Sequence, residues 1–291
     1  MFVSDNSIQA LKKYFQSELS AYFSEREIKS ITKLSVLERF QLDENDYILS
    51  NALRLSESDL LYFRQIVKRL QKNEPLQYIM GSTFFYGLKL KSDVRGLIPR
   101  PETEELVDWV KDTATVGNPK ILDLCTGSGC IALALKSLFN TSEIVGVDLS
   151  VAAIDLAKEN ANLTGSNVDF KVLDVLDDDL KSFENFDIWV SNPPYIPDED
   201  RLEMKENVLN YEPHIALFVS DENPLIFYQK IGEKAMVNLS AEGFLFFEIH
   251  EAFDYAVCDL LKSQGFVNIQ LRKDLQGKPR MIRAQKPKFT T

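Results

Sequence analysis

The stretch "ILDLCTGSGCIALAL" (residues 121–135) consists of an apolar run, a turn with two glycines and a second apolar run. Gly127 and Gly129 permit a tight turn, because glycine adopts backbone conformations that other residues avoid. Together with Ala132 they match G-x-G-x-x-[G/A], a pattern in which a strand–turn–helix unit brings its backbone close to a ligand. The stretch therefore predicts the first unit of an α/β domain.

The rest of the second half alternates between strand-like apolar runs and helix-like amphipathic runs. Continuous apolar strands indicate a sheet that is covered on both faces, and intervening helices indicate parallel strands. We therefore predict a Rossmann-like, doubly wound α/β domain with a mostly parallel seven-stranded sheet. The expected strands are residues 120–124, 143–148, 168–174, 186–191, 243–249, 266–271 and 280–285.

The first 73 residues follow a different pattern, in which apolar side chains recur at helical spacing. We predict an N-terminal helical domain, residues 1–73, built from about five short helices. Ser24 with Glu27, and Ser35 with Glu38, have the spacing of capping boxes that would begin new helices. This domain is either a structural appendage or a substrate-recognition domain for a macromolecular partner.

Residues 74–95 are predicted to form a β-hairpin linker, and residues 96–291 the α/β domain. In the linker, large apolar side chains alternate with a period of two, and Gly87 marks the turn. The segment "LIPRPETEELVDWV" then places two prolines before a helix that starts near Thr103. In it we expect Arg100 to form an internal ion pair.

Two carboxylates of that segment, Glu102 and Glu104, have two possible roles. They are either general bases or helix N-terminal residues stabilised by the helix dipole, and we favour the second role. Further along the chain, Tyr211-Glu212-Pro213 is expected to border the substrate cleft, with no role assigned. The run Asp177-Asp178-Asp179 is expected to be a solvated loop.

Composition excludes several classes of protein. The chain is 45% hydrophobic and 26% charged, as in soluble globular proteins, and no apolar run reaches the roughly 18 residues of a membrane span. We expect a cytoplasmic protein with no membrane partner. Three cysteines without a C-x-x-C pair and two histidines predict neither a disulfide framework nor a metal site.

The net charge of −11 is concentrated in the second domain. Residues 96–291 carry 32 acidic and 19 basic side chains, whereas residues 1–95 carry 12 and 14. Phosphate backbones attract basic proteins, so an acidic α/β domain argues against a direct nucleic-acid substrate.

The stretch "FDIWVSNPPYIPDED" (residues 186–200) ends a predicted strand with a stiff turn. Pro193 and Pro194 lack an N–H and fix their own φ angle, so the strand cannot continue. The Asn192 side-chain oxygen and the Pro193 carbonyl can each accept one N–H of a planar NH₂ group, while Tyr195 covers its flat face. Such preorganised acceptors predict a reaction at an amide or amino nitrogen.

A carboxylate near the glycine turn predicts the second half of the ligand site. Asp148 ends the second expected strand, about 20 residues beyond the turn, where it can accept hydrogen bonds from both ribose hydroxyls. The alternative is a helix cap, since Leu149-Ser150 follows. The glycine turn alone suits a nicotinamide cofactor or S-adenosylmethionine, and Asn-Pro-Pro-Tyr favours S-adenosylmethionine, whose product is S-adenosylhomocysteine.

These motifs resemble class I S-adenosylmethionine-dependent methyltransferases that modify exocyclic or side-chain nitrogens. More narrowly, the chain resembles the bacterial glutamine-N5 methyltransferases of peptide chain release factors. The combination of "IPRPETE" with Asn-Pro-Pro-Tyr is more specific than either motif alone. The stretches that carry the resemblance are residues 75–87, 97–107, 122–135, 147–150, 191–196, 211–217 and 274–280.

The resemblance implies a role for each candidate residue. The glycine turn would line the methionine end of the cofactor, through Cys125, Thr126, Gly127, Ser128 and Gly129. Asp148 would bind the ribose and Val175 would flank the adenine. The substrate glutamine amide would lie against Asn192, Pro193, Pro194 and Tyr195, with Asn192 also near the cofactor.

Three positions depart from the family pattern. The family usually has glycine at the position of Cys125 and commonly an aromatic residue at that of Val175. It also favours a glycine and a nearby glutamine where this chain has His250-Glu251-Ala252, so we assign that loop no role. By the resemblance, the partners of the chain are peptide chain release factors.

Four alternatives remain open from the sequence. The first is a ribosomal-protein glutamine methyltransferase, which the motifs separate poorly from a release-factor enzyme. The second is a DNA or RNA adenine-N6 methyltransferase, because the exocyclic amine of adenine presents the same two N–H donors as an amide. The third is a non-catalytic module that binds a translation factor. A nicotinamide oxidoreductase ranks last, because it has no use for Asn-Pro-Pro-Tyr.

Overall fold

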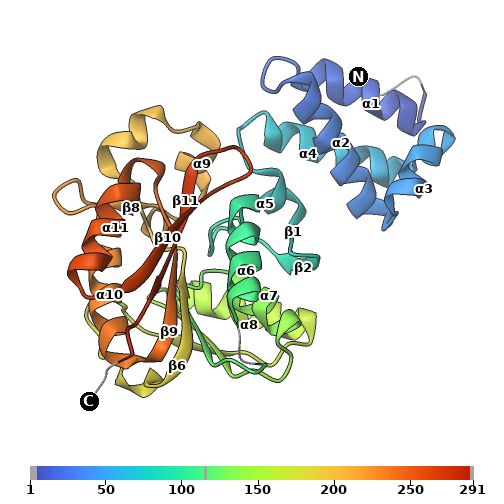
Figure 1. Ribbon diagram of the computed structural model, residues 1–291. Helices are drawn as coiled ribbons and strands as arrows, with labels where there is room; N and C mark the ends of the chain where they lie inside the picture. Colours follow the sequence, from blue (N-terminus) through green and yellow to red (C-terminus); the bar gives the residue numbers. More distant parts are fainter. Residues whose placement is uncertain (1–4, 115–116, 289–291) are drawn as a thin grey trace. The chain divides into compact units, whose positions relative to one another are not determined.

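The computed structural model describes residues 5–114 and 117–288, which form two compact units (Figure 1). The first contains the described residues up to Gly81 together with residues 206–211, and the second contains the rest. Residues 74–81, which we assigned to the linker, thus belong to the helical unit. The hairpin belongs to the α/β unit.

The first unit is a bundle of short helices around its own apolar core. The core includes Leu11, Phe15, Phe63 and Val67. The helices are α1 (Ile8–Leu19), α2 (Glu25–Phe40), α3 (Glu44–Leu49), the 3₁₀ turn η1 (Ser50–Ala52), α4 (Glu57–Leu70), α5 (Leu76–Met80) and α9 (Glu206–Tyr211).

Helix α9 joins this unit although it lies far along the chain. Asn73 Nδ2 donates to Glu206 Oε2 at 2.7 Å, and the Tyr211 hydroxyl donates to the Lys72 carbonyl at 2.9 Å. The sequence pattern did not indicate this placement.

One of the two predicted capping boxes is confirmed and the other is wrong. Ser24 caps α2, and its side chain and that of Glu27 bond each other's backbone N–H groups. Ser35 instead lies inside α2, buried, and its hydroxyl donates to the Ile31 carbonyl at 2.7 Å. The apolar face of α2 continues past Ser35, so the helix gains more by packing than by ending there.

The predicted hairpin is confirmed as β1 (Ser82–Phe85) and β2 (Leu88–Lys91), paired antiparallel. Tyr86 and Gly87 join the strands with φ angles of 48° and 76°. Two successive positive φ angles are the mark of the tight turn that suits the twist of paired strands.

The predicted sheet is confirmed with seven strands in the order β10-β11-β9-β6-β3-β4-β5. Five strands run parallel, and β11 pairs antiparallel with β9 and with β10. The strands are β3 (Ile121–Leu124), β4 (Ile144–Asp148), β5 (Asp169–Val172), β6 (Phe186–Ser191), β9 (Leu239–Glu248), β10 (Val267–Lys273) and β11 (Pro279–Gln285).

Helices cover both faces of this sheet, as the continuous apolar strands require (Figure 1). Alternate strand residues face opposite layers, so Phe246 packs with one set of helices and Phe247 with the other. The first layer contains α6 (Pro101–Thr113), α7 (Cys130–Leu138) and α8 (Val151–Thr164). The second layer contains α10 (Ile226–Asn238) and α11 (Asp254–Ser263).

Short elements that the sequence did not indicate follow strand β6. They include a two-stranded parallel sheet, in which Ile196 and Pro197 pair with Phe218 and Val219. The elements are β7 (Ile196–Pro197), η3 (Asp198–Glu203), η4 (His214–Ala216), β8 (Phe218–Val219) and, elsewhere, η2 (Lys181–Phe183) and η5 (Glu251–Phe253).

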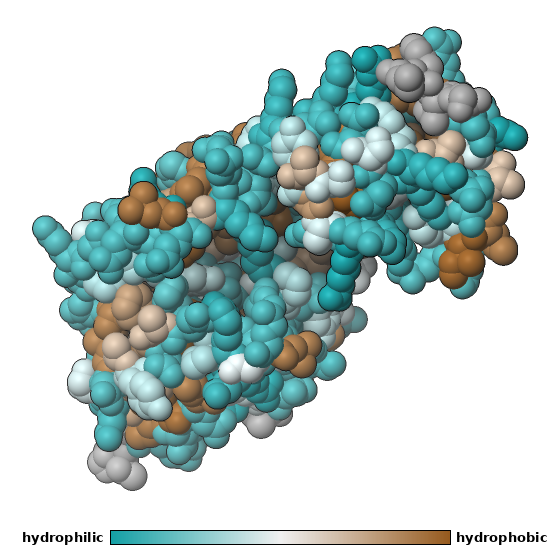
Figure 2. Space-filling view, turned by 90° about the horizontal axis from the view of Figure 1, so that it is seen from above, coloured by the Kyte–Doolittle hydropathy of each residue, from teal (hydrophilic) through white to brown (hydrophobic). Residues whose placement is uncertain are grey.

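The surface in Figure 2 is mostly hydrophilic, with hydrophobic side chains in small separate groups. Among the described helices, none combines the length and the apolar character that crossing a membrane requires.

Candidate active site

The glycine turn between β3 and α7 has the conformation that its sequence predicts. Gly127 and Gly129 have φ angles of 55° and 80°, and Cys125 has 60°, which is unusual for a residue with a side chain. A Cβ atom at Gly129 would lie 2.9 Å from Phe170 Cζ, so no larger residue fits there. The Thr126 N–H donates to the Val147 carbonyl at 3.0 Å, which ties the turn to β4.

Asp123 supports the glycine turn through hydrogen bonds, a role that we did not predict. Its Oδ2 accepts the Thr126 hydroxyl at 2.5 Å and the Ala132 N–H at 3.2 Å. The side chain is fully buried, and burial raises its pKa to about 7. An acidic residue inside the apolar run of β3 was the signal in the sequence.

This buried carboxylate should make stability depend on pH. Asp123 keeps its proton up to about pH 7 in the folded chain but loses it near 3.8 when unfolded. Its contribution to stability is complete below pH 3.8 and is lost as pH rises to 7, by about 1.4 kcal/mol per pH unit. In Asp123→Asn this loss should be absent.

Urea unfolding of both proteins between pH 4.5 and 7.5 measures the difference. The gap between their unfolding free energies should change across this range in favour of the variant as pH rises. Two parallel curves would contradict the assignment.

Asp148 lies at the end of β4, as predicted, and holds the turn. Its Oδ2 accepts the Gly127 N–H and its Oδ1 accepts the Ser150 N–H, both at 2.9 Å. The cap of α8 is Ser150, whose Oγ accepts the Ala153 N–H, so Asp148 is not the helix cap. Burial raises the pKa of Asp148. Each carboxylate oxygen keeps a lone pair that can accept a ligand hydroxyl.

A pocket lies beside the glycine turn and the end of β4, with about 710 Å³ of empty space when the adjoining open solvent is included. It contains several of the predicted residues, namely Cys125, Gly127, Asp148, Val175, Asn192 and Pro194. Of Tyr211-Glu212-Pro213, which we expected to border the cleft, only Pro213 lines the pocket. The pocket also contains residues that we did not predict, namely residues 95–97, 149–150, 153, 174, 176, 215–216 and 227.

The other predicted residues lie outside this lining. Thr126 and Ser128 are buried, as are Gly129 and Pro193, and they support the backbone of the two motifs. Tyr195 is half-buried.

The wall near Val175 is held by a lysine that the sequence did not single out. Lys234 Nζ, on α10, donates to the carbonyls of Val175, Leu176 and Asp178 at 2.7, 3.0 and 2.8 Å. The neighbouring run Asp177-Asp178-Asp179 is exposed, as expected for a solvated loop. Phe227, also on α10, lines the same pocket and brings an aromatic ring to the site where Val175 has none.

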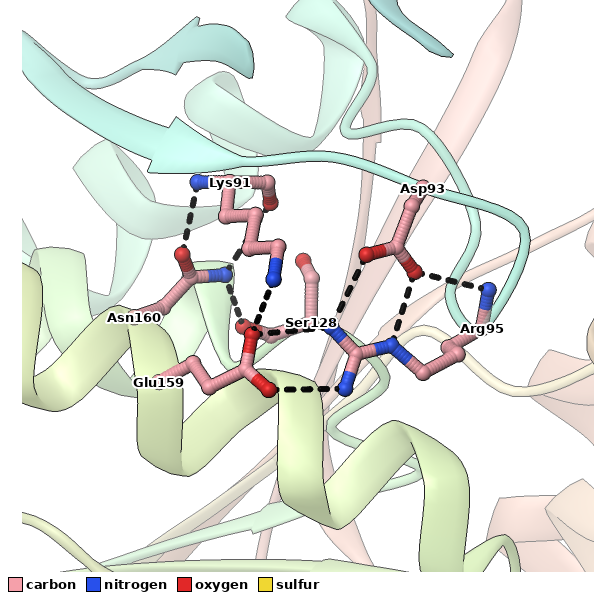
Figure 3. A network of polar contacts seen from close by, with 6 residues as sticks. All are labelled: Lys91, Asp93, Arg95, Ser128, Glu159 and Asn160. Carbon is pink, nitrogen blue, oxygen red and sulfur yellow. Dashed lines mark hydrogen bonds and ion pairs between the residues drawn. The ribbon is translucent and has the colours of Figure 1, made fainter. Parts of the chain in front are cut away.

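A second wall of the pocket is fastened by the polar network of Figure 3. Arg95 Nε and Nη2 donate to Asp93 at 2.9 and 2.8 Å, and Nη1 and Nη2 donate to Glu159 at 2.9 and 2.8 Å. Asn160 is buried and donates to the Ser128 carbonyl at 3.0 Å, while it accepts the Lys91 N–H at 2.7 Å. The segment after the hairpin is thereby attached to α8 and to the glycine turn.

Asn192 belongs to a hydrogen-bond chain whose central members, Thr103 and Glu248, are buried. Asn192 Nδ2 donates to Thr103 Oγ1 at 3.3 Å, and the Thr103 hydroxyl donates to Glu248 Oε2 at 2.6 Å. The Tyr195 hydroxyl donates to Glu248 Oε1 at 3.2 Å. Burial raises the pKa of Glu248 and of Tyr195. Neither Thr103 nor Glu248 was a candidate from sequence.

The predicted ion pair of Arg100 is confirmed. Its Nη2 lies 2.6 Å from Glu212 Oε1, and Glu212 is 3% exposed and accepts the Ile98 N–H at 3.1 Å. Glu102 and Glu104 lie in the first turn of α6, outside the pocket lining. Glu104 accepts the Tyr86 N–H at 2.6 Å, so it anchors the hairpin.

Of the other potentially reactive groups, Cys125 lines the pocket, whereas His250, Cys130 and Cys258 do not. His250 Nε2 lies 3.6 Å from Asp200 Oδ2, and burial lowers its pKa. Cys125, Cys130 and Cys258 are free thiols. Within residues 5–114 and 117–288, no group of three or more histidine, cysteine, aspartate or glutamate side chains could hold a metal ion.

The pocket fits S-adenosylmethionine in its donor pattern. Gly127 has open space where a side chain would stand, so a ligand can approach its backbone. Asp148 offers acceptors for ribose hydroxyls. Val175, Leu176 and Phe227 offer apolar surface for a base.

Comparisons with known proteins agree with this geometry. Residues 116–270 match the family model "Methyltransferase domain", and residues 11–81 match the model "PrmC N-terminal domain". A release factor glutamine methyltransferase of Flavobacterium psychrophilum is 41% identical over 95% of this chain and 98% of its own length. A release factor glutamine methyltransferase of Bacteroides thetaiotaomicron is 35% identical over 94% of this chain and 98% of its own length.

Solved structures share the fold at low sequence identity. A methyltransferase from Pyrococcus furiosus has a TM-score of 0.52 and 18% identity, and covers 77% of this chain and 98% of that chain. The hMettl16 catalytic domain has a TM-score of 0.54 and 16% identity, and the match covers 81% of this chain and 83% of that domain.

Proposed function

The chain belongs to the release factor glutamine methyltransferase family, and we propose that it methylates the glutamine of the Gly-Gly-Gln loop in peptide chain release factors. The methyl group of S-adenosylmethionine would pass to the N5 nitrogen of the side-chain amide. The chain is thus an S-adenosylmethionine-dependent N-methyltransferase.

One observation carries this function: Asn192 lines the same pocket as the glycine turn and Asp148. A group held by Asn192 therefore reaches the compartment in which the cofactor fits. Its Nδ2 is engaged by Thr103, which leaves Oδ1 to accept an N–H from the substrate.

The residues of the chain divide the work as follows. When bound, S-adenosylmethionine supplies an electrophilic methyl group on a positively charged sulfur. Asn192 Oδ1 and the Pro193 carbonyl accept the two N–H groups of the glutamine amide and so fix the direction of its nitrogen. Tyr195 covers the flat face of the amide. Asp148 and the backbone of Gly127 hold the cofactor.

An amide nitrogen is a weak nucleophile, because its lone pair is delocalised into the carbonyl. Two hydrogen-bond acceptors on the NH₂ group return electron density to the nitrogen. Alignment then supplies most of the acceleration, and such positioning is worth up to roughly 7–11 kcal/mol. The proton leaves late, to Asn192, to the Pro193 carbonyl or to water, so no histidine base is required.

The acidic charge of the α/β domain favours a protein substrate over an adenine base. An adenine-N6 enzyme must bind a phosphate backbone and extract its base from the stack. The helical N-terminal unit is the candidate surface for recognising the release factor.

Incubation with labelled S-adenosylmethionine, followed by mass mapping of the product, tests this function. The substrates are a release factor, the same factor with its Gly-Gly-Gln glutamine changed to asparagine, a ribosomal-protein extract and an adenine-containing oligonucleotide. Label on the glutamine of the unmodified factor alone is the expected result. Label only on a ribosomal protein or an adenine would overturn it, as would cofactor binding without transfer to any substrate.

A further inference from the structure

We infer that Thr103 and Glu248 are positioning residues, which set the orientation of the Asn192 side-chain amide through a one-way chain of hydrogen bonds. The inference rests on the proposed function, since it concerns how Asn192 is prepared to receive the substrate amide. It names two residues that come from α6 and β9, far in sequence from the Asn-Pro-Pro-Tyr motif.

The first step concerns the Thr103 hydroxyl, which has one proton and two lone pairs. At 2.6 Å from Glu248 Oε2, the hydroxyl donates its proton to the carboxylate. Only lone pairs remain for the second neighbour, Asn192 Nδ2, at 3.3 Å. Thr103 is 2% exposed, so its hydroxyl is shielded from bulk water.

The second step concerns Glu248, which determines the direction of the chain. It is 1% exposed and receives two O–H donors, from Thr103 on Oε2 and from Tyr195 on Oε1. Burial raises its pKa, whereas these two hydrogen bonds and the positive charge of Arg280 act in the opposite direction. Because both carboxylate oxygens act as acceptors of these O–H groups, Glu248 donates no hydrogen bond to Thr103, and the chain runs from Asn192 through Thr103 to Glu248.

The third step is the consequence for Asn192. If its amide were flipped, Asn192 Oδ1 would face the lone pairs of Thr103 Oγ1. Two acceptors cannot form a hydrogen bond, and a buried acceptor without a donor costs about 1–3 kcal/mol. The observed orientation therefore presents Oδ1 to the pocket that Asn192 lines. The same carboxylate holds the Tyr195 hydroxyl, so Glu248 fixes both ends of the motif.

Three variants with nearly unchanged shape test the inference. Thr103→Val removes the hydroxyl, and Thr103→Ser keeps it. Thr113→Val is the matched control, because Thr113 is a second buried threonine of α6, whose hydroxyl likewise donates one hydrogen bond, to the Trp109 carbonyl, and accepts one, from Arg283 Nη1. For each protein one measures kcat for glutamine methylation, the Kd for S-adenosylhomocysteine and the melting temperature.

We expect kcat of Thr103→Val to fall about 10- to 100-fold, because a reacting group misplaced by about 1 Å can cost 100-fold. Thr103→Ser should stay within about threefold of the wild type, and so should Thr113→Val. The Kd for S-adenosylhomocysteine should change less than about twofold in all three. A purely structural role for Thr103 would instead lower the melting temperature and would not separate kcat from cofactor affinity.

Glu248→Gln provides an independent test, because its amide can donate to Thr103 and allow the chain to reverse. Its kcat should fall by a similar factor. Wild-type kcat in both Thr103→Val and Glu248→Gln would overturn the inference, as would equal losses in Thr103→Val and Thr103→Ser. If the wild type itself methylates no release factor, the proposed function fails instead.

Discussion

Asn192→Ala should lower kcat for glutamine methylation by about 100- to 1,000-fold while changing the Kd for S-adenosylhomocysteine less than about threefold. The magnitude is that of removing one preorganised hydrogen-bond partner from a reacting centre. Asn192 supplies one of two acceptors that aim the substrate nitrogen, and alanine leaves one substrate N–H unpaired. Single-turnover methylation with labelled S-adenosylmethionine measures the effect.

The matched control is Asn167→Ala, which removes an exposed asparagine just before the edge strand β5, whereas Asn192 follows the central strand β6. It should keep wild-type turnover. Full activity of Asn192→Ala would remove the proposed role of the motif, and a parallel loss of cofactor affinity would show that Asn192 serves binding.

Asp148→Asn should weaken the binding of S-adenosylmethionine by about 10- to 100-fold. Both oxygens of Asp148 accept backbone N–H groups, from Gly127 and from Ser150. An asparagine side chain has only one oxygen, so its NH₂ group must face one of these donors. That NH₂ group also cannot accept a ribose hydroxyl, and the loss of one hydrogen bond to a charged acceptor costs about 1.5–3 kcal/mol, which corresponds to the expected factor.

Isothermal titration with S-adenosylmethionine and with S-adenosylhomocysteine measures this change. Asp155→Asn, an exposed aspartate on α8, is the control and should bind as the wild type does. At saturating cofactor, kcat of Asp148→Asn should stay within about fivefold of the wild type. Unchanged affinity in Asp148→Asn would exclude it from the ribose site.

The strands and the two ligand-facing motifs could be predicted because their signals are local. Each strand-like run became a strand within a few residues of its expected bounds. The signal is strongest for the central strands β3 and β6, because a strand buried on both faces needs a continuous apolar sequence. Glycine and proline restrict the backbone wherever they occur. Gly127 and Pro193 therefore indicated their turns without any knowledge of their neighbours.

Local signals failed where two stretches have the same sequence spacing and only packing decides which of them begins a helix. Ser35 with Glu38 has the same spacing as Ser24 with Glu27, yet only Ser24 begins a helix. The difference lies in the apolar face of α2, which is buried by other helices of the unit. Likewise, nothing in residues 206–211 themselves indicates that they join the N-terminal unit.

The support of the site depends on residues that are distant in sequence. Thr103 and Glu248 are 145 positions apart, and Lys234 lies 59 positions from Val175. A hydrogen bond requires two groups to lie close in space. The sequence around each of these residues does not indicate which distant residue the fold brings next to it.

The sequence by itself determined the succession of the main strands and helices along the chain, the glycine turn and the stiff Asn-Pro-Pro-Tyr corner. Each of these follows from the preferences of residues that are adjacent in the sequence. Only the tertiary structure decided which way the Asn192 amide faces and which side chains hold the pocket walls. Those depend on buried donors and acceptors that meet when the sheet and its helices pack.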